Sequence, residues 1–234
     1  MKFGVVIFPG SNCDKDIIHV LSKVMNCKVI ELWHKDKDLS MFNKEDCIML
    51  PGGFSFGDYL RTGAIARFSP IMESVIEFAN QGGKVWGICN GFQILCESGL
   101  LPGVLLRNDQ QQFICKNVFI KAATNKSLIT RGINLLEPLR IPIAHAEGRF
   151  YADEQTIHSI KENDQILFQY CDENGGVTLE ANPNGTLLNI AGICNKQRNV
   201  FGMMPHPERC TEDVLGNTDG KILFESMLQS VLSH

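Results

Sequence analysis

The stretch KVWGICNGFQIL, residues 84–95, places a cysteine between two glycines at a point where an apolar run gives way to helical spacing. Residues 84–88 predict a buried strand, and residues 90–97 predict a helix. Gly87 and Gly91 stand two residues before and after Cys89, where the chain reverses sharply and leaves no room for side chains. A strand that turns at once into a helix is typical of an α/β fold with a mostly parallel sheet.

The rest of the chain alternates short apolar runs with segments of helical spacing. The predicted strands span residues 3–8, 28–33, 47–50, 84–88, 113–122, 139–144, 165–170, 186–194 and 200–204. The predicted helices span residues 14–25, 70–80, 90–97 and 221–232. Several strands in the first hundred residues are nearly continuous apolar runs, so we expect these strands to be covered on both faces. We predict one α/β domain over residues 1–234, with a mostly parallel central sheet and an antiparallel extension between about residues 105 and 200.

The composition excludes several classes of protein. The chain is 44% hydrophobic and 21% charged, and its formal net charge of -4 does not indicate nucleic acid or an anionic membrane as a partner. No apolar run reaches the roughly 18 residues that a membrane span requires. The start, MKFGVVIFPG, is interpreted as a first strand and not as a signal peptide. We expect a cytoplasmic protein.

The nine cysteines are scattered, and they form no C-x-x-C pair. No histidine stands at ligand spacing from them, so the sequence argues against a zinc site and we expect no metal in this chain. Most of these cysteines are expected to be reduced, buried and inert.

Cys89 is the exception, because G-x-C-x-G has the form of the nucleophile elbow G-x-S-x-G. The turn lifts the thiol out of the sheet edge, and the positive end of the following helix stabilises a thiolate. The backbone N–H of Asn90 then faces the place where an oxyanion would form. The alternative is a structural turn with an inert cysteine.

His206 and Glu208 are the predicted base and its orienting carboxylate. They follow an apolar strand, and in an extended segment residues i and i+2 project to the same side. Pro205 and Pro207 favour extended geometry and stiffen the segment. A Cys–His pair oriented by a carboxylate is an acyl-transfer arrangement. The alternative is a surface loop.

Further candidates lie at other predicted strand ends. Gly53 follows the strand 47–50 and is the predicted second oxyanion donor, unless it marks a plain turn. Gln93 could bond a substrate amide, or it could be a solvated helix residue. The segment that contains His145, Glu147 and Arg149 carries both charge signs, which suits an amino acid but also an ordinary solvated loop.

These residues together resemble the class I glutamine amidotransferase family, through the elbow GICNGFQ (87–93) and the distal GMMPHPER (202–209). The further marks VVIFPGSNCDKD, LPGGFSFGDYLRTGAIARFSP, LLRNDQQQFICKN and IAHAEGRF are similar to the purine-biosynthetic branch of that family. They run from residue 5 to the distal motif and cover nearly the whole chain. Ala146 stands where the family usually has glycine.

The resemblance implies a flavodoxin-like fold and hydrolysis of L-glutamine through a γ-glutamyl thioester. It also implies three groups of site residues: the triad Cys89, His206 and Glu208; the oxyanion donors Gly53 and Asn90; and a glutamine subsite of Gln93 with His145, Glu147 and Arg149. The implied partners are a synthase subunit that uses ATP and Mg²⁺ and a small third subunit, with no cofactor in this chain.

Two rival functions stay open at this stage. A γ-glutamyl peptidase on the same fold would act without a partner, and a catalytically idle interaction subunit would keep the elbow only for its shape. The chain has no G-x-x-x-x-G-K-[ST] phosphate loop, which is consistent with ATP being used elsewhere.

Overall fold

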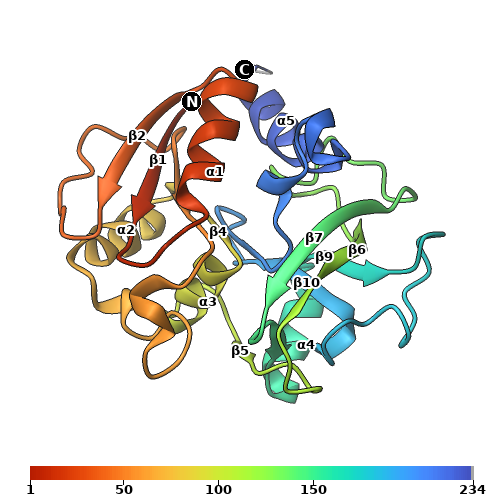
Figure 1. Cartoon of the computed structure of the whole chain (residues 1–234). Helices are drawn as coiled ribbons and strands as arrows, with labels where there is room; N and C mark the ends of the chain where they lie inside the picture. Colours follow the sequence, from red (N-terminus) through yellow and green to blue (C-terminus); the bar gives the residue numbers. More distant parts are fainter. Residues whose placement is uncertain (233–234) are drawn as a thin grey trace. The chain divides into compact units, whose positions relative to one another are not determined.

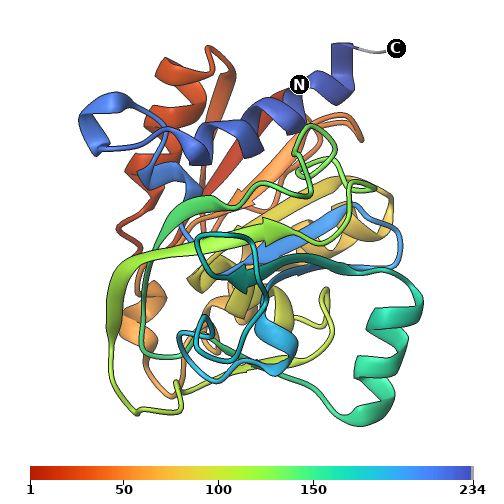
Figure 2. The same ribbon diagram turned by 90° about the vertical axis from the view of Figure 1, so that its right-hand side faces the viewer.

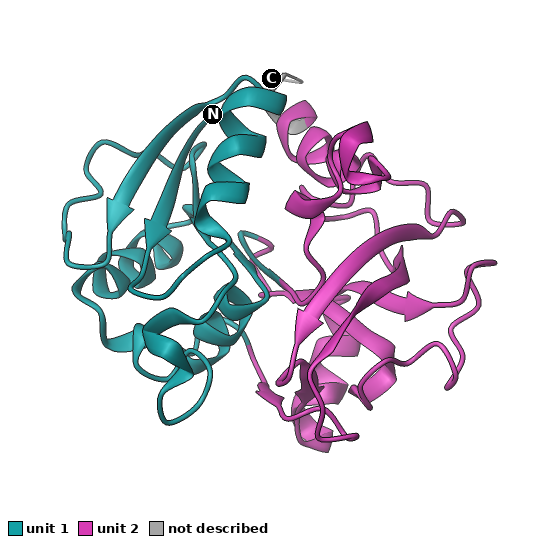
Figure 3. Cartoon of the chain, viewed as in Figure 1, with its two compact units in different colours: residues 1–101, 199–202 teal, residues 102–198, 203–234 magenta. Residues whose placement is uncertain are grey.

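A computed structural model describes residues 1–232 of the chain, and two compact units are distinguished within it (Figure 3). Unit 1 contains residues 1–101 and 199–202, and unit 2 contains residues 102–198 and those from 203 onward. The sequence analysis predicts one α/β domain over residues 1–234. Whether the two units form that one domain stays a prediction.

Unit 1 is built on the parallel strands that the sequence predicts (Figure 1). Its strands are β1 (Lys2–Ile7), β2 (Lys28–Trp33), β3 (Cys47–Leu50), β4 (Lys84–Ile88) and β11 (Val200–Met203), of which only the last residue, Met203, is assigned to unit 2. Their order is β2-β1-β3-β4-β11, and the pairs β1–β2, β1–β3 and β3–β4 are parallel. The carboxyl ends of these four strands therefore lie at one edge.

The crossovers of unit 1 run in opposite directions from β1 and β3. The first passes from β1 to β2 through α1 (Asp14–His19) and the π-helical turn η1 (Val20–Val24). The second passes from β3 to β4 through α2 (Pro70–Asn80). Because parallel crossovers are right-handed, these two connections lie on opposite faces of the sheet. The point between β1 and β3 is a topological switch point, where α/β sheets bind their ligands.

Unit 2 contains the antiparallel strands expected in the middle of the chain. The strands β10 (Ile190–Cys194), β9 (Ile166–Cys171), β6 (Ile114–Ala122) and β7 (Leu139–His145) pair in that order. All three of these pairings are antiparallel, and Figure 2 shows β6 (yellow-green) beside β7 (green). Unit 2 also contains the short pair β5 (Val104–Leu106) and β8 (Arg149–Tyr151), with the helices α4 (Glu154–Glu162) and α5 (Asp219–Leu232).

Some predicted boundaries are wrong for local reasons. The strand predicted over 186–194 starts only at Ile190, because Leu188 and Asn189 adopt φ values of 53° and 55° in a 3₁₀ turn. The helix predicted over 14–25 continues beyond His19 as a π-helical turn. The sequence reading missed α4, which begins where the Asp153 side chain caps the N–H of Thr156.

The core of unit 1 lies on both faces of its sheet. Strand residues that alternate between the faces are fully buried, among them Val5, Val6, Ile48, Met49, Val85 and Trp86. This burial confirms that β1, β3 and β4 are covered on both sides, as their apolar runs predict, whereas the edge strand β2 is largely exposed or half-buried. Among the described residues, no helix has both the length and the apolar character to cross a membrane.

Candidate active site

The nucleophile elbow is formed as the sequence predicts. Strand β4 ends at Ile88, and the helix α3 (Asn90–Glu97) begins immediately after Cys89. Cys89 adopts φ 50° and ψ -106°, which lies outside the regions that side chains with a Cβ normally occupy. A Cβ on Gly91 would lie 1.9 Å from the carbonyl oxygen of Leu50, and one on Gly87 would lie 2.6 Å from the carbonyl carbon of Gly91. Both glycines are therefore required by close packing, as predicted.

Several of the other cysteines are buried thiols with raised pKa values. All nine are free, and most are buried. Burial raises the pKa of Cys171 and of Cys194 to about 11 and that of Cys210 to about 12, and it also raises the pKa of Cys47 and Cys96. Cys89 is 5% exposed, so its thiol is mostly covered in the structure.

The loops that follow β1 and β3 meet at the switch point. Ser11 and Gly53 form an isolated antiparallel bridge, and a Cβ on Gly53 would lie 2.6 Å from the backbone nitrogen of Asn12. The Cys13 N–H donates to the Gly52 carbonyl at 3.4 Å, and the Phe54 N–H donates to a carbonyl of the β1 loop at 3.4 Å. Gly53 has φ 120°, a conformation that requires glycine. Its predicted role as an oxyanion donor remains a prediction.

The side chain of Asn90 ties the β3 loop to helix α3. Its Oδ1 accepts from the Ser55 N–H at 3.2 Å, while its Nδ2 donates to Asp58 Oδ1 at 3.2 Å and to Gln93 Oε1 at 2.9 Å. Gln93 is only 4% exposed, so its alternative interpretation as a solvated helix residue is wrong. Sequence reasoning assigned a role only to the backbone of Asn90 and missed this side chain.

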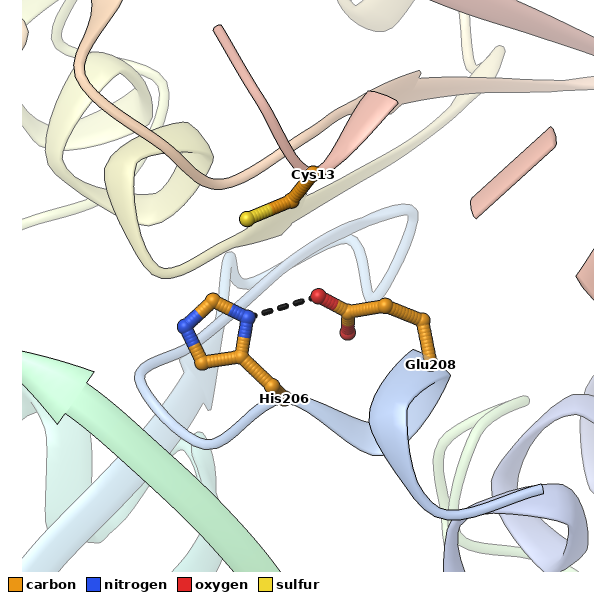
Figure 4. Close-up of side chains that lie close together, drawn as sticks. All are labelled: Cys13, His206 and Glu208. Carbon is orange, nitrogen blue, oxygen red and sulfur yellow. Dashed lines mark hydrogen bonds and ion pairs between the residues drawn. The ribbon is translucent and has the colours of Figure 1, made fainter. Parts of the chain in front are cut away.

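His206 and Glu208 are brought together in unit 2. Their side chains are joined from His206 Nδ1 to Glu208 Oε1 at 2.6 Å, as Figure 4 shows. Exposed fractions of 1% and 2% rule out the alternative of a surface loop. The predicted extended path is wrong in detail, because Pro207 opens a 3₁₀ turn over Pro207–Arg209. The His206 N–H donates to the Pro142 carbonyl of β7 at 2.8 Å, which anchors the turn.

The predicted triad draws on both units. Cys89 belongs to unit 1, whereas His206 and Glu208 belong to unit 2. The completed triad therefore remains a prediction.

His145 is a neutral group at the end of β7. It is 3% exposed, and burial together with the positive charge of His206 lowers its pKa to about 4. Glu147 and Arg149 therefore carry the two charges of this loop at pH 7. Arg149 Nε donates to the carbonyl of Arg107 at 3.0 Å. The assignment of this loop to glutamine binding stays a prediction.

Asn108 makes most of the hydrogen bonds that hold the backbone of the His145 loop. The sequence analysis names it only as part of a family motif. It is fully buried, and its Nδ2 donates to the His145 carbonyl at 2.9 Å and to the Gln112 carbonyl at 2.8 Å. Its Oδ1 accepts from the Gly148 N–H at 3.1 Å and faces His145 Nδ1 at 3.2 Å. Its own N–H donates to the Ala146 carbonyl at 2.8 Å. The imidazole thus carries its proton on Nδ1, because Oδ1 can only accept.

Comparison with known proteins places this geometry in a family. A model of the CobB/CobQ-like glutamine amidotransferase domain matches residues 1–225. A relative from Koribacter versatilis, named phosphoribosylformylglycinamidine synthase subunit PurQ, is 56% identical over 97% of this chain and 97% of its own length. A relative of the same name from Moorella thermoacetica is 54% identical over 97% of this chain and 95% of its own length.

Solved structures agree with the sequence matches. A chain in the structure of PurLQS from Thermotoga maritima is 38% identical, with a TM-score of 0.84 over 98% of both chains. A glutamine amidotransferase from Thermotoga maritima, at 13% identity and a TM-score of 0.61 over 100% of this chain and 99% of its own, shares the fold alone. The predicted α/β, flavodoxin-like class I amidotransferase fold is confirmed. Since the family model covers almost the whole chain, the chain belongs to the CobB/CobQ-like glutamine amidotransferase family.

Proposed function

We propose that this chain is the glutaminase subunit of a phosphoribosylformylglycinamidine synthase, a carbon–nitrogen ligase of purine biosynthesis that uses glutamine as its amide donor. The chain hydrolyses L-glutamine to glutamate and ammonia. A synthase subunit uses the ammonia and ATP to convert formylglycinamide ribonucleotide to formylglycinamidine ribonucleotide. Support comes from relatives that carry this subunit name and match nearly end to end.

The reaction proceeds through a thioester on Cys89. The thiolate attacks the carbon of the glutamine side-chain amide, and the N–H groups of Gly53 and Asn90 bind the resulting oxyanion. His206, held by Glu208, gives a proton to the leaving nitrogen as the C–N bond breaks. Water then attacks the thioester with His206 as the base and releases glutamate. Gln93 and the loop of His145, Glu147 and Arg149 hold the substrate.

The observation that carries this proposal is the backbone conformation of Cys89. A φ of 50° with a ψ of -106° costs a non-glycine residue about 1–3 kcal/mol, and such strain clusters at active sites. A serine, cysteine or threonine in this position gains nothing for stability from that conformation. The conformation does make the nucleophilic side chain project from the end of the strand, at the start of the helix.

The proposal also covers partners and compartment. The synthase subunit supplies the ATP and Mg²⁺ site, a small third subunit joins the complex, and this chain needs neither cofactor nor metal. We place the enzyme in the cytoplasm, because nine free thiols suit a reducing compartment.

The test is a glutaminase assay of the chain alone and with the synthase subunit, ATP and formylglycinamide ribonucleotide. We expect slow hydrolysis alone and a large increase with the complete system. Equal activity with and without the partner would contradict the purine assignment and favour a γ-glutamyl peptidase.

Labelling with a glutamine-like electrophile tests the site. We expect a single adduct on Cys89, which mass spectrometry locates by its peptide. An adduct on another cysteine, or none, would refute the nucleophile and favour an idle interaction subunit.

A further inference from the structure

The side chain of Asn90 is engaged at both ends. It is 2% exposed, and its amide meets the Ser55 N–H, the Asp58 carboxylate and the Gln93 amide at 2.9–3.2 Å. Two of these partners belong to the loop that carries Gly53, and the third lies on the first turn of helix α3. The side chain of the residue after the nucleophile thus connects the two backbone segments that carry the proposed oxyanion donors.

The loop needs such a connection, because its own conformation is unfavourable. Phe56, Gly57 and Asp58 have φ values of 53°, 67° and 53°, and a left-handed conformation is costly for the two that bear a Cβ. On one side, the loop is bonded to the β1 loop through the Phe56 N–H and the Pro9 carbonyl at 2.6 Å. On the other side, Asn90 bonds it to helix α3 through Ser55 and Asp58.

We infer that the Asn90 side chain and the Asp58 carboxylate are positioning residues, which hold the loop of residues 52–58 against helix α3 so that the Gly53 N–H stays aligned with the oxyanion. This inference rests on the proposed function and extends it from the backbone donors to two side chains that act through them. An oxyanion donor stabilises a transition state only when its geometry is fixed beforehand. A loop that is not held in place should therefore lower kcat more than it raises KM.

Asp58 offers the sharpest test, because its contribution can be removed and restored. In Asp58→Ala the Asn90 Nδ2 keeps Gln93 Oε1 as an acceptor but loses the one in the loop, whereas in Asp58→Asn the new Oδ1 still accepts. We expect Asp58→Ala to lower kcat for glutamine about 10- to 100-fold, with KM within about threefold. Asp58→Asn should recover kcat to within about threefold of the wild type. Both are assayed in the complex at saturating synthase subunit, so that weakened docking does not contribute.

Alkylation separates positioning from general damage. Iodoacetamide forms its bond to Cys89 by displacing iodide and develops no oxyanion, so its rate at Cys89 should be unchanged in Asp58→Ala. The rate is followed on the Cys89 peptide by mass spectrometry. The matched control is Asp38→Ala, which removes an exposed carboxylate that accepts from the Ser40 N–H outside this loop. Its kcat should equal that of the wild type.

Three results would overturn the inference while the wild type remains an active glutaminase. They are full activity of Asp58→Ala, equal losses in Asp58→Ala and Asp58→Asn, and slowed alkylation of Cys89 in Asp58→Ala. A wild type with neither glutaminase activity nor electrophile labelling at Cys89 would instead refute the proposed function, and the inference with it.

Discussion

The Cα of Gly91 faces the carbonyl oxygen of Leu50 so closely that a Cβ in its place would lie 1.9 Å from that oxygen. Because the contact is with backbone, neither partner can move aside without shifting strand β3 or helix α3. We expect Gly91→Ala to displace the elbow, lowering stability by about 1–3 kcal/mol and kcat at least about 10²-fold. Urea denaturation and the glutaminase assay measure the two effects.

The control for this variant is Gly132→Ala. The nearest atom to a Cβ there is the end of the flexible Gln229 side chain at 3.2 Å, which can move. Its activity should match the wild type. An active Gly91→Ala enzyme would show that the elbow tolerates displacement of the helix.

The bond between His206 and Glu208 gives a second prediction. Glu208→Gln keeps an acceptor for the Nδ1 proton but removes the charge that favours a protonated imidazole. We expect kcat to fall by about 10²–10⁴ with little change in KM, as for comparable triads. The exposed carboxylate of Glu154 serves as control, since Glu154→Gln should have no effect. A normal kcat in Glu208→Gln would remove Glu208 from the catalytic scheme.

Elements set by local pattern could be predicted from the sequence. The strands 28–33, 47–50 and 84–88 and the helices 70–80 and 90–97 match the structure to the residue. Their apolar runs and the punctuation by glycine and proline are local signals. The elbow was predictable from its G-x-C-x-G spacing between an apolar run and a helical segment, although the contact that requires Gly91 is with Leu50 on the distant strand β3.

Contacts between distant segments could not be predicted in this way. Asn108 bonds to His145 and Gly148, which lie 37 and 40 residues away, and nothing in its own neighbourhood indicates either partner. The strands β5 and β8 have three residues each, too few to show a period. The motif LLRNDQQQF indicates the family, but the sequence assigns no role to its asparagine. The structure shows that this asparagine, Asn108, bonds to the backbone of the His145 loop.

The lowered pKa of His145 predicts a pH dependence of stability. In the unfolded chain a histidine titrates near pH 6.5, whereas buried His145 titrates at about 4. Between these values the unfolded chain binds a proton that the folded chain does not, so the free energy of unfolding falls as the pH drops. Between pH 6.5 and pH 5 the loss from this residue is about 1.6 kcal/mol.

Urea denaturation of His145→Gln at the same two pH values measures that contribution. The difference in the free energy of unfolding between the two pH values should shrink by about 1.6 kcal/mol relative to the wild type. His158→Gln, which alters an exposed side chain, should leave the difference unchanged. Parallel behaviour of wild type and His145→Gln would mean that His145 is protonated in the folded protein.

Asn108 supports a final prediction about the His145 loop. Asn108→Ala leaves the Gly148 N–H, His145 Nδ1 and the His145 carbonyl without their partner in a buried place, and it also removes the bond to the carbonyl of exposed Gln112. Each unsatisfied buried group costs about 1–3 kcal/mol, so for these three groups we expect a total loss of at least about 3 kcal/mol on urea denaturation. Asn134→Ala removes an exposed amide that donates to Glu137 at 2.9 Å and should change stability by less than about 0.5 kcal/mol. If the loop holds glutamine, folded Asn108→Ala enzyme will also show a raised KM, because Glu147 and Arg149 lose their fixed backbone. A lowered stability with an unchanged KM would mean that Asn108 stabilises the fold only and that this loop does not bind glutamine.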